Sequence, residues 1–295
     1  MNEFYYKTIC ILVTHNPEIN HLKAVCRSIN INKSELIIID NASKNYAEIR
    51  SSLPEANIIK QNENLGIAKA QNIGIENALR MGYHYLWFSD QDTLYEKDFL
   101  FLIFKHISDL EKEKIKFAAI GPAYTNAEDD YTYPFVRINK KFEYFNPKNQ
   151  LCECSQLISS GTIMPQESIL NIGYFRQDFF IDYVDLEWCW RAINKGYKIY
   201  GAGNIKIKHY LGDKTIKLFN RNIHIRSAFR IYHIIRNSTF IVFHTNLINF
   251  RCKLSIFIYE LRCALLLCLA SNQRIKLSKA ILKGYLDGIF GNLSK

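Results

Sequence analysis

Residues 85–92 read YLWFSDQD, an apolar run of strand length that ends in two carboxylates. The stretch TICILVT at 8–14 runs into His15-Asn16, and LIIID at 36–40 is followed by Asn41. Runs this apolar and this short are typical of strands buried on both faces of a parallel sheet. Each of the three ends in polar side chains, so the same edge of the sheet would carry all three polar clusters.

Helical patterns separate the apolar runs, as in residues 19–29, where Leu22, Val25 and Ile29 recur at helical spacing. We expect strands at 8–14, 36–39, 58–59, 85–89, 117–120, 157–165 and 197–200, and helices at 19–29, 66–81, 98–113 and 184–195. This alternation predicts an α/β fold, a mostly parallel sheet flanked by helices. In such sheets ligands bind beyond the carboxyl ends of the strands. Residues 121–150 are polar and aromatic without a clear period and predict a loop or flap.

Composition and charge describe a folded chain with a distinct tail. Of 295 residues 48% are apolar, which excludes a disordered polymer. Residues 204–295 hold 16 of the 38 Lys and Arg and three of the 28 Asp and Glu, a net charge of +13, which leaves −3 for the first 203 residues. The basic tail predicts contact with an anionic surface. Eight cysteines without a CxxC pair predict reduced core thiols in a cytosolic protein, and the N-terminus predicts a first strand rather than an export signal.

The pair Asp90 and Asp92 has the spacing of a metal site. In extended backbone, residues i and i+2 point to the same face, so both carboxylates can converge on one cation. Mg²⁺ prefers oxygen ligands, often one or two carboxylates together with substrate phosphates. Alternatively the acids cap the helix that starts at Asp98 or simply turn the chain.

Two further clusters allow a binding and a structural interpretation. Asp40, followed by Asn41, could accept a hydrogen bond from a nucleobase or a ribose hydroxyl, or could simply terminate the strand in a turn. Residues 62–66, NENLG, open a helix whose N-terminus could hold a phosphate or carry an Asn cap. Neither G-x-G-x-x-G nor G-x-x-x-x-G-K-[ST] occurs, so the sequence supports neither a dinucleotide site nor a P-loop.

Asp182, Asp185 and Glu187 lie at the predicted start of a helix, where the helix dipole favours acids. Asp182 and Asp185 have the spacing of a cap pair, and one of the three acids could instead be a general base for an attacking hydroxyl. Paired carboxylates also suggest a glycoside hydrolase. A hydrolase has no use for a metal pair beside a nucleotide edge, so we disfavour it.

Seven motifs, in order, resemble family 2 glycosyltransferases with the GT-A fold: VTHN, IIIDNAS, QNENLGIAKAQNIGI, WFSDQDT, ISSGT, FFIDYVDLEWCWRAINKGY and KHYLGD. They are most similar to the rhamnosyltransferase group of bacterial surface-polysaccharide synthesis. The resemblance covers roughly residues 7–240. It implies a GT-A domain over 1–215, with a nucleotide-sugar half at 1–120 and an acceptor half at 121–215, followed by a basic helical extension at 216–295.

The resemblance also implies a role for each matching residue. Thr14, Asn16, Asp40 and Asn41 would face the donor nucleoside, Asn64 and Gly66 the ribose and diphosphate, Asp90 the diphosphate, Asp92 and His209 a divalent Mg²⁺ or Mn²⁺, and Asp185 would be the catalytic base. Many relatives carry Glu before that base, where this chain has Val184. The departure leaves Asp182 and Glu187 as alternatives to Asp185.

The implied activity is inverting transfer of a sugar, L-rhamnose from dTDP-L-rhamnose as the first choice, onto a glycan acceptor. A polyprenyl-diphosphate-linked oligosaccharide fits the family and the basic tail, in O-antigen or capsular polysaccharide synthesis. A non-catalytic sugar-nucleotide-binding subunit of a polysaccharide-synthesis complex is the alternative. A nucleotidyltransferase would need a Gly-rich or basic phosphate loop near the first strand, which VTHNPEIN does not offer.

The tail carries the prediction of location. Residues 254–270, LSIFIYELRCALLLCLA, are short for a transmembrane helix and contain Glu260 and Arg262. Basic amphipathic helices on an anionic membrane fit better, which predicts a cytoplasmic protein peripheral on the inner face of the bacterial plasma membrane. Packing against the core or a homodimer is the alternative. No nucleic-acid motif is visible, so no nucleic acid partner is expected.

Overall fold

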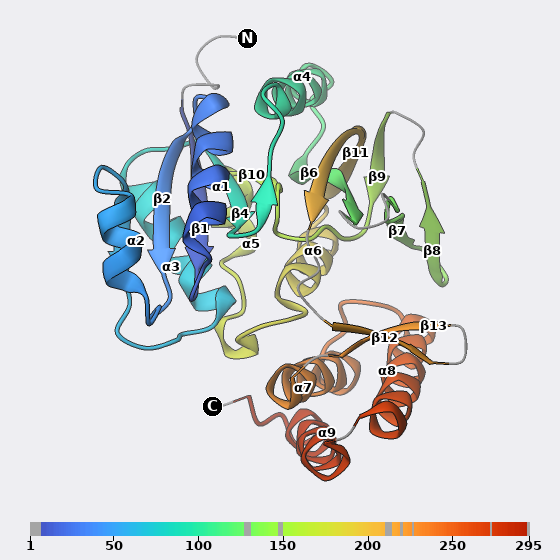
Figure 1. Cartoon of the computed structure of the whole chain (residues 1–295). Helices are drawn as coiled ribbons and strands as arrows, with labels where there is room; N and C mark the ends of the chain where they lie inside the picture. Colours follow the sequence, from blue (N-terminus) through green and yellow to red (C-terminus); the bar gives the residue numbers. More distant parts are fainter. Residues whose placement is uncertain are drawn as a thin grey trace.

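The computed structural model describes residues 7–126, 131–146, 150–209, 214–218, 221–225, 227–271 and 273–293, with backbone only for 209–225 and for Ala270. Nine strands in this part of the chain form one sheet, with the order β3-β2-β1-β4-β10-β6-β11-β5 and with β9 beside β11 (Figure 1). Their bounds are β1 (Thr8–Thr14), β2 (Glu35–Asp40), β3 (Asn57–Lys60), β4 (Tyr85–Asp90), β5 (Thr93–Leu94), β6 (Phe117–Asn126), β9 (Leu151–Cys154), β10 (Ile163–Pro165) and β11 (Lys198–His209).

The predicted α/β fold with a mostly parallel sheet is confirmed. Strand β1 lies between β2 and β4 and is parallel to both, and all seven of its residues are buried. In register, Thr14 is opposite Asp40 and Val13 is opposite Asp90. Strand β10 is antiparallel to both β4 and β6. The parallel register brings the carboxyl ends of β1, β2 and β4 to one edge.

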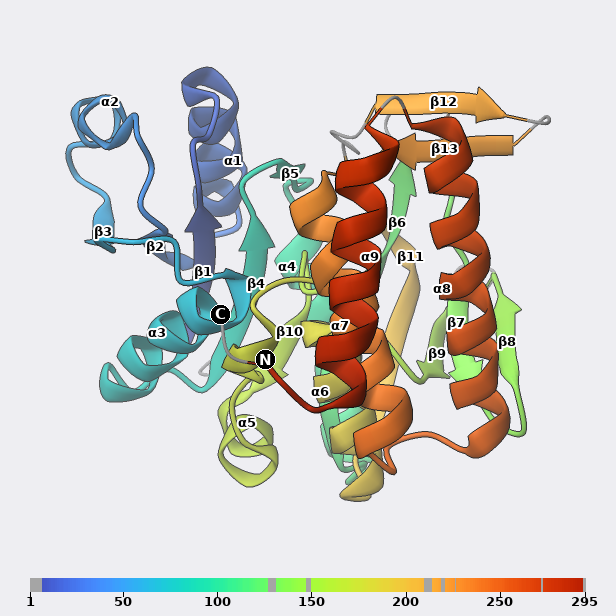
Figure 2. The ribbon, with the colours of Figure 1, turned by 90° about the horizontal axis from the view of Figure 1, so that it is seen from below.

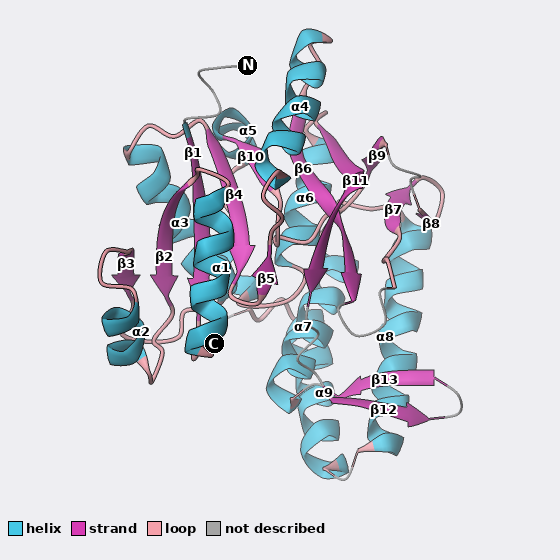
Figure 3. Cartoon of the chain, turned by 45° about the horizontal axis from the view of Figure 1, so that its top comes forward, coloured by secondary structure: helices cyan, strands magenta, loops and turns pink. Residues whose placement is uncertain are grey.

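Helices cover both faces of the sheet (Figure 3). They are α1 (Ile19–Ile31), α2 (Tyr46–Ser52), α3 (Ile67–Arg80), α4 (Phe99–Lys112), α5 (Gln166–Ile172) and α6 (Val184–Asn194). Alternate residues of a strand point to opposite faces, so β1 serves two cores. Ile9 and Ile11 pack with α3, α5 and α6, whereas Cys10 and Leu12 pack with α1 and α4.

Three expectations about secondary structure are wrong. The segment 121–150, expected to be a loop, continues β6 to Asn126 and then forms a hairpin of β7 (Phe135–Ile138) and β8 (Phe142–Phe145). The expected strand 157–165 is extended only at β10, because the chain turns at Gly161, whose φ is +78°. After residue 200 the chain is not all helical, since β11 runs to His209 and β12 (Lys214–Leu218) pairs with β13 (Arg221–Ile225).

The C-terminal helices α7 (Ala228–His244), α8 (Phe250–Ala270) and α9 (Arg274–Ile289) lie side by side (Figure 2). They share a small core that includes Ile235 of α7 and Ile281 of α9. A Cβ on Gly288 would lie 2.6 Å from the Cβ of Thr239, so glycine allows α9 to approach α7 closely. No helix among the described residues is long and apolar enough to cross a membrane.

Helix α7 also joins the main body, because Phe240 and Ile241 are part of the core on the α3 and α6 side of the sheet. The division of the chain at residue 216 therefore stays a prediction. Five of the eight cysteines are buried, and within the described residues no disulfide joins any of them.

Candidate active site

Asp40 ends β2 at the carboxyl edge and is completely buried. Its Oδ1 accepts a hydrogen bond from the Thr14 hydroxyl at 3.2 Å, and its Oδ2 accepts one from the Ser43 backbone N–H at 3.1 Å. Asp40 therefore connects the end of β1 to the turn after β2. These contacts support the structural interpretation of this acid, in which it ends the strand in a turn.

His15 is central to the neighbouring polar cluster. Its Nδ1 lies 2.8 Å from the Asn41 carbonyl oxygen, which can only accept, so Nδ1 carries the proton. The Nε2 atom is then an acceptor, 3.0 Å from the Asn16 Nδ2 and 3.5 Å from the Asn64 Nδ2. The predicted residues Asn16, Asn41 and Asn64 thus meet around an imidazole that carried no role in the sequence analysis.

Asn41 and Asn64 connect this cluster to α3. Asn41 donates from Nδ2 to the Asn64 Oδ1 at 3.0 Å, and the same oxygen accepts the Gly66 N–H at 3.0 Å. The N-cap residue is Gly66 and makes no side-chain cap bond, so the Asn cap, one of the two interpretations of this helix start, is not formed. The first N–H of the helix, at Ile67, donates instead to the Phe180 carbonyl at 2.7 Å. This N–H is therefore not available to a phosphate.

Gly66 cannot be replaced without moving the chain. Its φ is +81°, and a Cβ there would lie 2.6 Å from the Phe180 carbonyl oxygen. A side chain would therefore be strained in its backbone and would push the 180 loop away from α3.

Asp90 ends β4, and Asp92 follows two residues later, just before β5. Between them Gln91 reaches back to the end of β1: its Oε1 accepts the His15 N–H at 2.8 Å. Residues 91–92 form a turn between β4 and β5, whereas the N-cap of α4, Asp98, makes no side-chain cap bond.

Two further segments approach this acid pair. The backbone of His209 is opposite Thr93 in the pairing of β11 with β5, although its side chain lies outside the described part of the structure. The Thr93 and Ser160 hydroxyls are 2.6 Å apart. No cluster of three His, Cys, Asp or Glu side chains suited to a metal occurs among the described residues.

Asp185 is in the first turn of α6 and contacts the segment that contains Ser160. Its Oδ2 accepts the Ser159 N–H at 3.1 Å, and its Oδ1 accepts the Leu186 N–H at 2.9 Å. Burial raises the pKa of Asp185 to about 6, and the nearby negative charge of Asp90 adds to the rise, while the two N–H groups oppose it. Residues 159–160 thus contact both Asp185 and Thr93, the residue that follows Asp92.

The other two acids have structural partners. Asp182 forms an ion pair with Arg230 of α7, with the Arg230 Nε 3.1 Å from its Oδ2. Glu187 is buried and pairs with Arg191 one helical turn later, at 3.0 Å. The expected cap pair of Asp182 and Asp185 is wrong, because α6 has no side-chain cap.

The loop before α6 is held by α7, which sequence patterns did not indicate. Phe180, Asp182 and Tyr183 all have positive φ, near 60–65°. The buried Asn237 places its Nδ2 2.9 Å from each of three carbonyl oxygens, those of residues 179, 181 and 182. The buried Arg236 donates to the Asp178 carbonyl at 2.8 Å. Only the folded chain brings these residues together.

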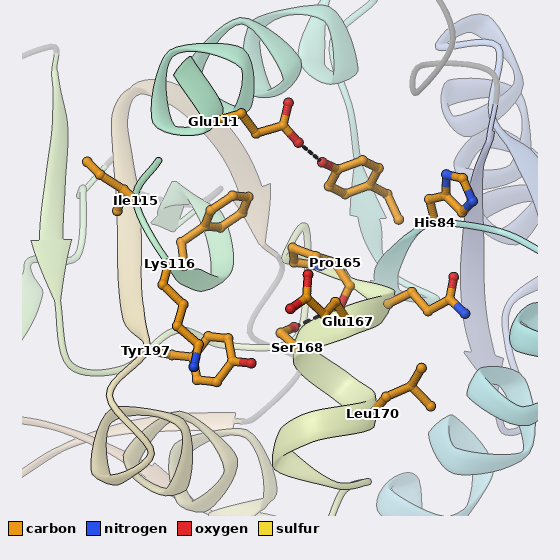
Figure 4. A pocket seen from close by; sticks show the side chains of 12 residues that line it. His84, Glu111, Ile115, Lys116, Pro165, Glu167, Ser168, Leu170 and Tyr197 are labelled. Atoms are coloured by element: carbon orange, nitrogen blue, oxygen red, sulfur yellow. Dashed lines mark hydrogen bonds between the residues drawn. The ribbon is translucent and has the colours of Figure 1, made fainter. Parts of the chain in front are cut away.

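Two pockets differ in their relation to this site. A pocket of about 690 Å³ has Asn64 and Phe180 on one wall and α7 and α9 on the other. The pocket in Figure 4, of about 490 Å³, includes Tyr85 and Phe117 at the starts of β4 and β6. It therefore lies at the opposite edge of the sheet and contains none of the predicted site residues.

Comparisons with known proteins agree on the family. Residues 10–173 match the family described as Glycosyl transferase family 2. The dTDP-rhamnosyl transferase RfbF of Shigella flexneri is 30% identical over 289 residues, which is 95% of each chain.

Solved structures agree on the fold. S. aureus TarS in complex with UDP-GlcNAc has a TM-score of 0.58 at 12% identity, over 96% of this chain and 81% of that one. GalNAc-T7 with UDP, GalNAc and Mn²⁺ has a TM-score of 0.57 at 12% identity, over 81% of this chain and 48% of that one. With the family match over more than half of its length, the chain belongs to glycosyl transferase family 2 and is a glycosyltransferase similar to rhamnosyltransferases.

Proposed function

We propose that this enzyme is an inverting, metal-dependent glycosyltransferase that transfers L-rhamnose from dTDP-L-rhamnose to a lipid-linked oligosaccharide, in the synthesis of a bacterial O-antigen or capsular polysaccharide. One observation carries the proposal: residues 159–160 contact both Asp185, through the Ser159 N–H at 3.1 Å, and Thr93, the residue after Asp92, through the Ser160 hydroxyl at 2.6 Å. The rhamnosyl donor is supported by the likeness to RfbF.

The donor nucleoside and diphosphate bind along the ends of β1, β2 and β4 in this proposal. Thr14, Asn16, Asp40, Asn41, Asn64, Gly66 and Asp90 form the donor site. The network around His15 supports it, because these polar groups already hold one another in place at 2.8–3.5 Å. A preorganised polar site binds with little further ordering of its side chains.

The donor set fits a divalent ion. Two carboxylates two residues apart, beside a bound diphosphate, are the hard oxygen ligands that Mg²⁺ and Mn²⁺ prefer. Asp92 and His209 would hold the ion, and Asp90 would face the diphosphate. Such an ion neutralises the charge that develops on the departing diphosphate.

Asp185 is the general base of the proposed reaction. Its carboxylate takes the proton from the acceptor hydroxyl as that oxygen attacks the anomeric carbon, and the nucleoside diphosphate leaves from the opposite face. A single displacement of this kind inverts the anomeric centre. A base with a pKa near 6 is ionised at neutral pH and is still basic enough to accept the proton.

Contact with an anionic membrane is supported by α8. Its exposed apolar residues recur every three or four positions along one stripe: Phe250, Leu254, Ile258, Leu261, Leu265 and Leu269, each at least 40% exposed. Four lysines and arginines, at 274, 276, 279 and 283, lie on the adjacent α9. An exposed apolar stripe within a basic helical segment is typical of helices that lie on anionic lipid, so we propose that the enzyme lies on the inner face of the plasma membrane.

A donor panel tests the proposal. Purified enzyme is incubated with dTDP-L-rhamnose, UDP-GlcNAc and UDP-glucose, each with Mg²⁺ or Mn²⁺, and release of the nucleoside diphosphate is measured. We expect release from dTDP-L-rhamnose that EDTA abolishes and that Asp92→Ala reduces by at least 100-fold. Equal release in the presence of EDTA would show that the reaction does not depend on a metal. No release from any donor would favour a non-catalytic sugar-nucleotide-binding subunit.

A further inference from the structure

Three tyrosines form a row at the end of β6. Thr132 pairs with Thr125 in an antiparallel bridge, and the backbone N–H of Tyr133 donates to the Tyr124 carbonyl at 3.0 Å. The Tyr124 and Tyr133 rings are stacked, with centroids 4.7 Å apart and planes at 21°. Tyr131 meets Tyr133 edge to face, with centroids 5.2 Å apart and planes at 84°. Residues 131 and 133 lie on one face of this hairpin, together with Tyr124.

The row runs from Tyr124, on the side of Asp185, through Tyr133 to Tyr131, which is exposed to solvent. Pro122, two residues before Tyr124 on β6, lies against Gly161, where a Cβ would be 2.8 Å from the proline ring. Ser159, two residues before Gly161, donates its N–H to Asp185 at 3.1 Å, so this end of β6 and Asp185 are in contact with the same segment. Tyr124 and Tyr133 are partly buried, whereas Tyr131 is 54% exposed. The donor cluster at Asn41 and Asn64 lies at β2 and α3, on the other part of the edge.

We propose that Tyr124, Tyr131 and Tyr133, the tyrosine row, form the acceptor subsite and stack against sugar rings of the acceptor glycan. This inference rests on the proposed function, because it takes Asp185 to be the base that the acceptor hydroxyl must reach. The C–H faces of a sugar carry partial positive charge and pack on the electron-rich faces of aromatic rings. A row with one buried and one exposed end suits a chain of sugars that enters from solvent.

A purely structural role makes a different prediction. Cross-strand aromatic pairs stabilise hairpins, and loss of such a pair would lower the melting temperature without a specific effect on the acceptor. Tyr131 separates the two roles best because it is the most exposed of the three and contributes least to the fold. Tyr144, which is 69% exposed on β8, is the matched control in the neighbouring hairpin.

The test uses the full-length enzyme and two assays. Transfer is measured against rising concentrations of polyprenyl-diphosphate glycolipids extracted from a bacterium with a rhamnose-containing surface polysaccharide. Hydrolysis of dTDP-L-rhamnose without acceptor gives the donor KM. We expect Tyr131→Ala and Tyr133→Ala to raise the acceptor KM about 10-fold while the donor KM stays within 2-fold. Tyr131→Phe keeps the ring, and we expect it to stay near wild type.

Three results would overturn the tyrosine row as the acceptor subsite: an unchanged acceptor KM in Tyr131→Ala, an equal rise in Tyr144→Ala, or a rise explained by a lower melting temperature. The proposed function fails in a distinguishable way. In that case the wild-type enzyme itself neither hydrolyses the donor nor transfers to the extracted glycolipids.

Discussion

At the scale of single residues, three acids within six positions have three different environments. Glu187 forms an ion pair with Arg191, and Asp182 forms one with Arg230. Asp185 instead accepts only backbone N–H groups and lies near the negative charge of Asp90. Perturbed carboxyl groups of this kind are concentrated at functional sites, and this difference makes Asp185 the best candidate base.

The raised pKa of Asp185 predicts the pH profile of the enzyme. The base acts only when it is ionised, so kcat/KM should fall below about pH 6, with a slope of one proton. Initial rates of transfer between pH 5 and pH 9 measure the profile. Asp185→Asn should reduce kcat by about 10²–10⁴-fold while calorimetry still detects donor binding.

The control for this substitution is Asp109→Asn, on the exposed face of α4, which should keep wild-type rates. Full activity of Asp185→Asn, or a rate that stays constant down to pH 4, would show that another group is the base.

The same carboxyl group should lower stability at neutral pH. Because its pKa is raised from 3.8 to about 6 in the folded protein, the stability that its protonated form provides is complete below about pH 3.8 and is lost as the pH rises through 6. A rise of about two pKa units corresponds to about 3 kcal/mol, and Asn leaves one N–H without its acceptor at about 1 kcal/mol. Asp185→Asn should therefore raise the free energy of unfolding at pH 8 by about 1–2 kcal/mol.

Urea denaturation at pH 8 and at pH 4 measures this difference. The gain of Asp185→Asn over wild type should be larger at pH 8 than at pH 4. A variant that is less stable than wild type at pH 8 would mean that the two backbone hydrogen bonds outweigh the burial of the charge.

At the scale of elements, the sequence predicted those strands that are buried on both faces. Strands β1, β2 and β4 are continuous apolar runs, and their parallel register brings their polar ends to one edge of the sheet, as predicted. The hairpins β7–β8 and β12–β13 were missed because their residues mix aromatic, basic and polar side chains without strict alternation. Local pattern carries little information for strands of such mixed composition.

The contacts that hold the loop before Asp185 in place were even harder to predict from the sequence. Asp182 and Arg230 are 48 positions apart, and Asn237 reaches residues 55 to 58 positions away. Spacing within a helix cannot indicate such partners, which depend on how α7 docks. The sequence therefore suggested Asp182 as a cap, whereas the fold uses it to fix the loop before Asp185.

Asn237 of α7 should act as a positioning residue for this loop. Asn237→Ala removes the donor that lies 2.9 Å from three loop carbonyls and leaves buried acceptors without their partner. We expect a loss of about 2–4 kcal/mol in unfolding free energy and a fall in kcat that exceeds the change in donor KM. Thermal unfolding and transfer kinetics measure both effects.

Asn246→Ala, in the exposed connection between α7 and α8, is the matched control and should change neither quantity. Wild-type kcat in a folded Asn237→Ala variant would mean that the loop keeps its conformation without α7.

At the scale of the whole molecule, charge and exposed apolar surface coincide. The first 203 residues carry a net charge of −3 and hold the whole predicted donor site, whereas the rest carry +13. Three contacts join the basic helices to the loop before α6. Arg230 pairs with Asp182, and Arg236 donates to the Asp178 carbonyl. The Tyr183 hydroxyl donates to Glu260 at 2.7 Å. A membrane that binds α8 and α9 would thus be connected through these side chains to the loop before Asp185, the proposed base.

The apolar stripe of α8 should drive binding to anionic vesicles. Leu261→Glu and Leu265→Glu each replace an exposed leucine, 42% and 59% exposed, by a carboxylate that lipid phosphates repel. We expect each to lower co-sedimentation with phosphatidylglycerol vesicles at least 5-fold, because apolar burial and basic attraction act together at such a surface. Leu170→Glu on α5 makes the same substitution at a residue 60% exposed elsewhere and should bind like wild type. The opposite result would be a wild-type protein that does not bind the vesicles and α8 variants that convert a dimer to a monomer in solution. That result would mean that the stripe is a contact between two copies of this chain.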